Sequence, residues 1–154
     1  MSVFYSFHYD RDNWRVHQIM EMGVIEGTPL LNHQEWEKVK RSGDSAIRNW
    51  IDSQMRYKSA VIVLAGYQTA GRPWVRYEIN RALELGKPLL GVRINGLKDK
   101  SGRTDPEGRN PFDFLGFESL LIPLHRPYGY TSTDRYADIR KNLRYWAEDG
   151  YRRN

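Results

Sequence analysis

Short apolar runs alternate along the chain with longer stretches in which apolar residues recur every three or four positions. Residues 3–7 are β-branched and aromatic, which predicts a first strand, and residues 28–31 predict a short second strand. The clearest strand covers residues 59–66, because a nearly continuous apolar run is typical of a central parallel strand buried on both faces. Two further strands are expected at residues 88–94 and 120–122.

Helices are expected between these strands. The first begins near residues 10–12, and the second follows a Ser-Gly-Asp sequence at residues 42–44 that can cap a helix. A third helix is predicted over residues 73–85 and a last one over residues 133–148. Residues 95–111 are rich in Gly, Pro and charged residues and predict a loop.

This alternation of strands and helices predicts a single α/β domain over residues 1–154. Five strands favour the flavodoxin-like order 2-1-3-4-5 in a parallel sheet with helices on both faces. In such sheets ligands bind outside the carboxyl ends of the strands. We therefore expect residues 7–12, residues 66–74 and the segment from residue 95 onward to surround one crevice.

The amino-acid composition argues against several kinds of functional site and partner. The chain has no Cys, which excludes a thiolate nucleophile, a disulfide and a Cys-ligated metal. Its His residues lack the spacing of metal ligands, so we expect no metal. The net charge is +5, but basic residues are interleaved with acidic ones, which argues against a nucleic-acid partner. No signal-peptide pattern and no apolar run of ~20 residues occur, so we expect a cytoplasmic protein without a membrane segment.

The third predicted helix holds the most informative polar residues. Its apolar residues form one core stripe: Val75, Ile79, Ala82 and Leu83. Trp74, Glu78 and Arg81 share an adjoining face near the mouth of the crevice. Spacing alone favours an exposed ion pair between Glu78 and Arg81, and it favours a solvated turn at residues 10–12.

Four segments resemble TIR domains in their residues and in their order along the chain. They are the first strand at residues 3–7, the end of the second loop with its helix at residues 42–51, the central strand at residues 57–64, and the W-x-x-x-E helix with the following strand at residues 74–88. Residues 6–9, 74–79 and 110–113 are most similar to the TIR-like proteins of the bacterial Thoeris anti-phage defence system. This closer match extends to about residue 117.

The resemblance implies an enzyme that cleaves the bond between nicotinamide and ribose in NAD, with Glu78 as the catalytic residue. NAD is then the substrate, and no cofactor is implied. A carboxylate suits this reaction because bond breaking builds positive charge on the ribose. The resemblance also implies an ADP-ribose-derived product, cyclic or otherwise modified, that activates a separate effector protein, and it allows self-association of the TIR domains.

Seven further residues are expected to bind substrate in this interpretation. They are Phe7, His8 and Tyr9 after the first strand, Trp36 and Ser42 beside the loop that gates the site in TIR proteins, and Trp74 and Tyr77 in the motif helix.

Two other functions stay open at this point. The same fold could serve as a non-enzymatic binding or scaffold module, which would have no need of a carboxylate at Glu78. A different N-glycosidic enzyme, such as a nucleoside deoxyribosyltransferase, would use a similar Glu as its nucleophile. A phosphoacceptor domain would need an Asp where the central strand ends in Ala65, and neither common phosphate-loop motif is present.

Overall fold

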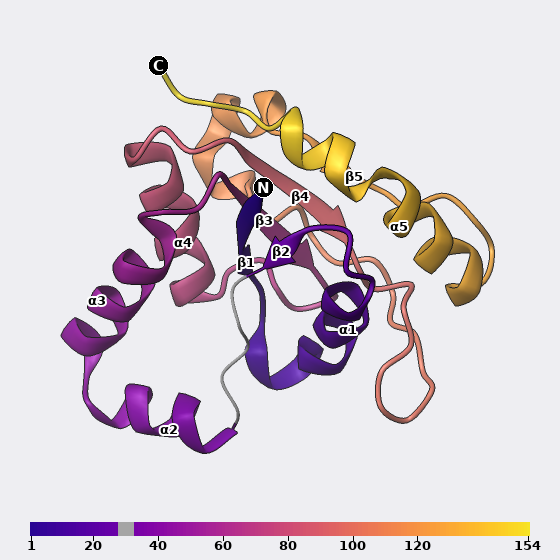
Figure 1. Cartoon of the computed structure of the whole chain (residues 1–154), viewed down its shortest axis with the longest axis horizontal. Helices are drawn as coiled ribbons and strands as arrows, with labels where there is room; N and C mark the ends of the chain where they lie inside the picture. The colour runs from indigo at the N-terminus through magenta and orange to yellow at the C-terminus, as the bar shows by residue number, and fades with distance from the viewer. Residues whose placement is uncertain (28–32) are drawn as a thin grey trace.

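The computed structural model describes residues 1–27 and 33–154. Five strands form one parallel sheet in the order β2-β1-β3-β4-β5, with helices on both faces (Figure 1). The predicted α/β class and strand order are therefore confirmed. The elements are β1 Ser2–Ser6, α1 Tyr9–Glu21, β2 Glu26–Gly27, α2 His33–Arg41, α3 Asp44–Met55, β3 Ala60–Ala65, α4 Pro73–Glu84, β4 Leu89–Arg93, η1 Asp113–Leu121, β5 Leu124–His125 and α5 Ser132–Glu148.

The central strand divides the core into two halves. All six residues of β3 are buried, and the strand lies between β1 and β4 as predicted. Side chains alternate across the sheet, so Ile62 and Leu64 pack with α1 and α5, whereas Val61 and Val63 pack with α3 and α4. The core stripe predicted for the third helix is buried against this second face.

The last strand differs from the prediction. Residues 120–122 were expected to form it, but Leu120 and Leu121 are exposed and belong to the 3₁₀ segment η1. Strand β5 begins two residues after Ile122, where Leu124 pairs with Gly91. The apolar run was misleading because only Ile122 packs into the core, and the hydrogen-bonded ladder starts at Pro123, whose carbonyl accepts from the Gly91 amide.

The connection between β1 and β3 also departs from expectation. The predicted second strand at residues 28–31 lies outside the described residues, and β2 is a two-residue strand just before it. Helix α2 covers a stretch for which the sequence predicted no element. The cap of α3 is Gly43 without a side-chain hydrogen bond, because the Ser42 hydroxyl donates to the Lys38 carbonyl instead.

The expectation of a solvated turn at residues 10–12 is wrong for Asp12. This residue lies within α1 and is fully buried, as is Arg15 one turn later. Arg15 Nη1 is 2.9 Å from Asp12 Oδ1 and 3.0 Å from Asp105 Oδ2. The Arg15 guanidinium also donates to the carbonyls of Leu97 and Arg103, so it fixes the long loop at residues 95–111 against α1.

Candidate active site

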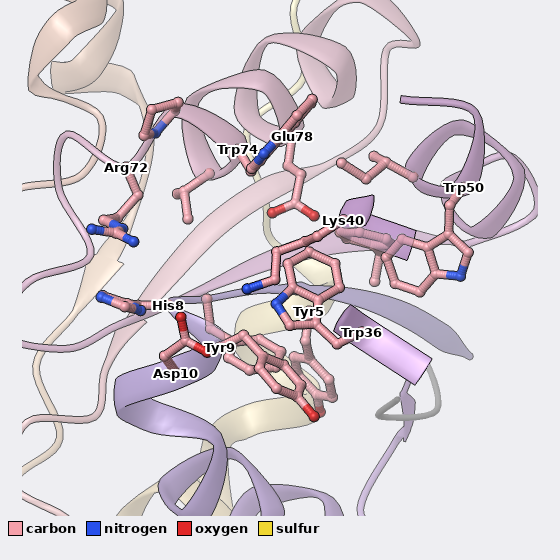
Figure 2. A pocket seen from close by; sticks show the side chains of 15 residues that line it. Tyr5, His8, Tyr9, Asp10, Trp36, Lys40, Trp50, Arg72, Trp74 and Glu78 are labelled. Carbon is pink, nitrogen blue, oxygen red and sulfur yellow. The ribbon is translucent and has the colours of Figure 1, made fainter. Parts of the chain in front are cut away.

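A pocket opens at the carboxyl edge of the sheet, between the end of β1, the segment that follows it, and helices α2, α3 and α4 (Figure 2). The prediction that Glu78 borders the same pocket as residues 7–10 is confirmed. The cavity volume is about 160 Å³. It is lined by Phe4, Tyr5, Phe7, His8, Tyr9, Asp10, Trp36, Lys40, Trp50, Ile51, Arg72, Pro73, Trp74, Val75 and Glu78. We call it the Glu78 pocket.

The Glu78 carboxyl is the buried acid of this pocket. Only 8% of the residue is exposed, and its Oε1 accepts a 2.7 Å hydrogen bond from the Ser6 hydroxyl. Burial raises the pKa of Glu78 to about 8, and the Ser6 hydrogen bond acts weakly in the opposite direction. A carboxyl in such a setting is strongly stabilised as an anion when a positive charge enters the pocket.

The exposed ion pair that spacing favoured for Glu78 does not form. Arg81 instead bonds Asp52 Oδ1 and Glu84 Oε2, each at 3.1 Å. Val75 and Ile79 are buried residues of α4. Glu78 lies between them around the helix axis, so its side chain also points toward the protein interior. Pro73 starts the helix at its first turn, which places Glu78 one turn further, beside the end of β1.

Aromatic rings line one side of the pocket in an unbroken series. The Phe7 and Tyr9 ring centres are 6.0 Å apart, the Tyr9 and Trp36 centres 5.4 Å, and the Trp36 and Trp50 centres 6.2 Å. These residues come from the segment after β1 and from helices α2 and α3. Such a surface stacks on a flat heterocycle, and its ring faces attract cations.

His8 and Arg72 lie at another side of the pocket (Figure 2). Burial lowers the pKa of His8, and the neighbouring positive charge of Arg72 lowers it further. His8 is therefore neutral at pH 7, when it can donate one hydrogen bond and accept another. Lys40 also lines the pocket, where its ammonium group lies 3.0 Å from Glu37 and 5.6 Å from the Trp36 ring centre.

The structure brings most of the predicted site residues together but leaves two apart. Phe7, His8, Tyr9, Trp36 and Trp74 line the pocket with Glu78. Ser42 and Tyr77 do not belong to its lining. Ser42 is exposed just after the end of α2, and the Tyr77 hydroxyl donates to Asp52 of α3 at 3.0 Å. Their positions give no support to a direct contact with substrate.

Sequence reasoning missed several residues that line this pocket. Tyr5, Lys40, Trp50 and Arg72 were not among the expected site residues. Trp50 comes from α3, and its ring contacts that of Trp36 in the aromatic series. Arg72 directly precedes the Pro that starts α4, and this position at a helix N-terminus after a strand was a usable signal.

Within residues 1–27 and 33–154, no three His, Asp or Glu side chains gather closely enough to hold a metal ion. In the same part of the chain, no helix combines the length and apolar character needed to cross a bilayer. The groups available for chemistry in the Glu78 pocket are therefore one buried carboxyl, a neutral imidazole, two cationic side chains and aromatic faces.

Comparisons with known proteins identify the family of the chain. Residues 4–99 match the family model described as Thoeris protein ThsB, TIR-like domain. A protein of Bacillus cereus (strain MSX-D12) named "Putative cyclic ADP-D-ribose synthase ThsB1" is 37% identical over 121 residues, which cover 75% of this chain. The aligned part spans 63% of that relative's length. The chain therefore belongs to the Thoeris ThsB family of proteins with a TIR-like domain.

Proposed function

We propose that this protein cleaves the nicotinamide–ribose bond of NAD and converts the ADP-ribose part into a cyclic signal. The observation that carries the proposal is the buried Glu78 carboxyl, which faces an aromatic pocket and accepts from the Ser6 hydroxyl. In the part of the chain that the structure describes, no cation pairs with it. NAD brings the missing positive charge, because its nicotinamide ring is a pyridinium cation. The name of the B. cereus relative supports the same class of reaction.

The chemistry follows from where the charge moves. When the bond between the ribose C1 and the nicotinamide nitrogen breaks, its electron pair stays on nicotinamide, which leaves as a neutral molecule. Positive charge then develops on the ribose, where the Glu78 carboxylate stabilises it. Binding of the pyridinium ring lowers the pKa of Glu78 from about 8, so the carboxylate is present when the bond breaks. Ser6 positions this carboxylate through its hydrogen bond.

The second half of the reaction needs a nucleophile for the ribose cation. A hydroxyl of the same ADP-ribose attacks C1 and transfers its proton to the Glu78 carboxylate, which closes a ring and leaves the Glu78 carboxyl protonated. Aromatic side chains that cover the bound ribose would shield C1 from water, which supports ring closure over hydrolysis. We propose that the cyclic product is released as a signal to a separate effector protein in anti-phage defence.

Incubation of the purified protein with NAD, followed by mass spectrometry, tests the proposal. We expect free nicotinamide and a product with the mass of ADP-ribose less one water. Glu78→Gln keeps the volume of the side chain but removes its charge, so turnover should fall by on the order of 10²-fold or more. Glu84→Gln is the matched control, because the same change is made in the last turn of the same helix at an exposed ion pair.

The comparison is made in phage-infected cells as well as with purified protein, so that an infection trigger is supplied. Loss of product in Glu78→Gln but not in Glu84→Gln supports the proposal. Equal amounts of product from the wild type and both variants would show that Glu78 is not catalytic and would favour the scaffold function. A covalent mass increase of the protein at Glu78 would favour a glycosyl-enzyme, as in a nucleoside deoxyribosyltransferase.

A further inference from the structure

A second hollow adjoins the Glu78 pocket at Arg72. It is formed by residues 67–72, which follow β3, and by residues 107–109 of the long loop, and its volume is about 530 Å³. We call it the outer groove. Arg72 lines both hollows, so a ligand that leaves the Glu78 pocket on this side passes the Arg72 guanidinium before it reaches the outer groove.

The outer groove carries an excess of positive charge. Arg72 forms no ion pair within the described part of the chain, and Arg109 is two-thirds exposed, with Asp113 at 3.7 Å. The acid of the groove, Glu107, is already bound by Arg93 at 2.9 Å and by Arg126 at 2.7 Å. Arg72 is also the N-cap of α4, whose first turn has no side-chain cap, so the helix dipole adds to the same positive potential.

Close backbone packing fixes the shape of this groove. A Cβ atom at Gly108 would collide with the carbonyls of Gly66 and Tyr67, so the two walls touch at this point. Arg93 Nη1 holds the Gly108 carbonyl at 2.8 Å. Gly71 has a φ of +86°, and a Cβ there would lie 3.2 Å from Arg109 Nη2. The cationic groups are therefore presented by a preorganised wall, which lowers the cost of binding a ligand.

Size and charge together give the direction in which a dinucleotide would lie. The Glu78 pocket, at about 160 Å³, is smaller than the ~300–1,000 Å³ of sites that enclose a complete small-molecule ligand. It holds one end of a dinucleotide, and the remainder must extend past its rim. Of the two cationic side chains that line it, Lys40 is paired with Glu37, whereas Arg72 is unpaired and leads to the outer groove.

We propose that Arg72 and Arg109 form a diphosphate subsite, which binds the two phosphates of a dinucleotide whose nicotinamide riboside end occupies the Glu78 pocket. The inference rests on the proposed function for the identity of the ligand. Guanidinium groups suit this role because their planar donors bind phosphate oxygens in pairs. Tyr67, 42% exposed at the groove, offers a ring face to the base beyond the diphosphate.

Calorimetric titration with ADP-ribose tests the subsite without any need for cleavage. We expect Arg72→Gln to weaken ADP-ribose binding by about 10- to 100-fold, since a hydrogen bond between charged groups is lost. Arg109→Gln should weaken it less, because Arg109 is already shared with Asp113. The control Arg140→Gln removes the same charge from an exposed position on α5 and should leave the affinity unchanged. Thermal melting of each variant establishes that it is folded.

A comparison of two substrates separates this subsite from the reacting centre. Nicotinamide riboside carries the same scissile bond as NAD but no phosphate. Arg72→Gln should lower kcat/KM for NAD by at least tenfold more than kcat/KM for nicotinamide riboside, because only NAD loses a phosphate contact. Absence of ADP-ribose binding by the wild type, equal affinity in the wild type and Arg72→Gln, or equal losses for both substrates would overturn the subsite. Failure of the proposed function has a different signature, in which ADP-ribose binds through Arg72 but NAD is not cleaved.

Discussion

Two carboxyl groups are buried near the carboxyl edge of the sheet, Asp12 in α1 and Glu78 in α4, and their surroundings differ. Asp12 contacts a fully buried guanidinium, that of Arg15, which also contacts Asp105 and two loop carbonyls. Glu78 has one neutral donor, Ser6, and an open pocket in front of it. Burial raises the pKa of both groups, but Asp12 has an arginine that opposes this effect.

The difference separates an acid that is paired inside the fold, Asp12, from the acid that we propose to be catalytic, Glu78. A buried charge that faces an opposite charge can hold two segments together. Asp12 Oδ1 contacts Arg15, and Arg15 holds the loop at residues 95–111 against α1. A buried acid without a counter-charge is costly to ionise, and it persists at a site where a ligand supplies the missing charge. Charge partners, rather than burial alone, therefore distinguish the two regions.

Removal of Arg15 should give the largest effect on stability. Arg15→Met leaves Asp12 buried without its partner and leaves the carbonyls of Leu97 and Arg103 without their donor. We expect the free energy of unfolding to fall by about 3–5 kcal/mol, measured by urea denaturation. Arg144→Ala breaks an exposed pair with Glu148 and serves as the control, with a change within about 0.5 kcal/mol. Similar small losses in both variants would mean that the buried network is not a tether.

The pH dependence of stability should identify Glu78 as the uncompensated acid. Its pKa is about 8 in the folded protein against an ordinary value of 4.5, so the unfolded chain releases the proton first as the pH rises. Between these values the free energy of unfolding should fall by about 1.4 kcal/mol per pH unit through this group. Stability from the protonated carboxyl is complete below pH 4.5 and is lost by pH 8.

Glu78→Gln lacks this titration, so its stability should rise relative to that of the wild type across the same pH range. Urea denaturation at several pH values between 4.5 and 8 measures the difference. Glu84→Gln should show no such trend, because Glu84 is exposed. A constant difference between Glu78→Gln and the wild type at all pH values would show that Glu78 has an ordinary pKa.

Ser6→Ala should have an intermediate effect. The hydroxyl of Ser6 lowers the pKa of Glu78, so its removal should move the pH profile of NAD turnover to higher pH. The free energy of unfolding should change by about 0.5–1.5 kcal/mol, as for one hydrogen bond. A profile of unchanged midpoint would mean that Ser6 only fills space. Ser6→Thr, which keeps a hydroxyl, should restore the wild-type midpoint.

The smallest effects are expected at Ser42 and Tyr77. Both lie outside the lining of the Glu78 pocket. Ser42→Ala should leave stability within about 0.5 kcal/mol of the wild type, and Tyr77→Phe should leave NAD turnover unchanged. Steady-state kinetics and thermal melting measure both. A marked rise in KM for NAD in either variant would show that this residue contributes to NAD binding. The pocket would then have to change shape when NAD binds.

Much of the architecture could be predicted from local sequence. The apolar run at β3 and the helical stripe of α4 indicated elements that the structure contains. Strand β5 was misplaced, because apolar residues that stay exposed on η1 have the same composition as a short strand. In the site, the position of Glu78 beside the segment after β1 followed from topology, since parallel strands bring their carboxyl ends to one edge.

The sequence by itself determined the elements with a strong local period, such as β3 and α4, because these depend on residues close together in the chain. The alternation of strands and helices favoured the strand order. Tertiary structure decided which polar residues are buried and what they meet. Ser6 and Glu78 are 72 positions apart, and Arg15 and Leu97 are 82 apart. Such contacts depend on how elements pack. Packing pairs Arg15 in the interior, whereas within residues 1–27 and 33–154 neither Arg72 nor Glu78 has an ion-pair partner.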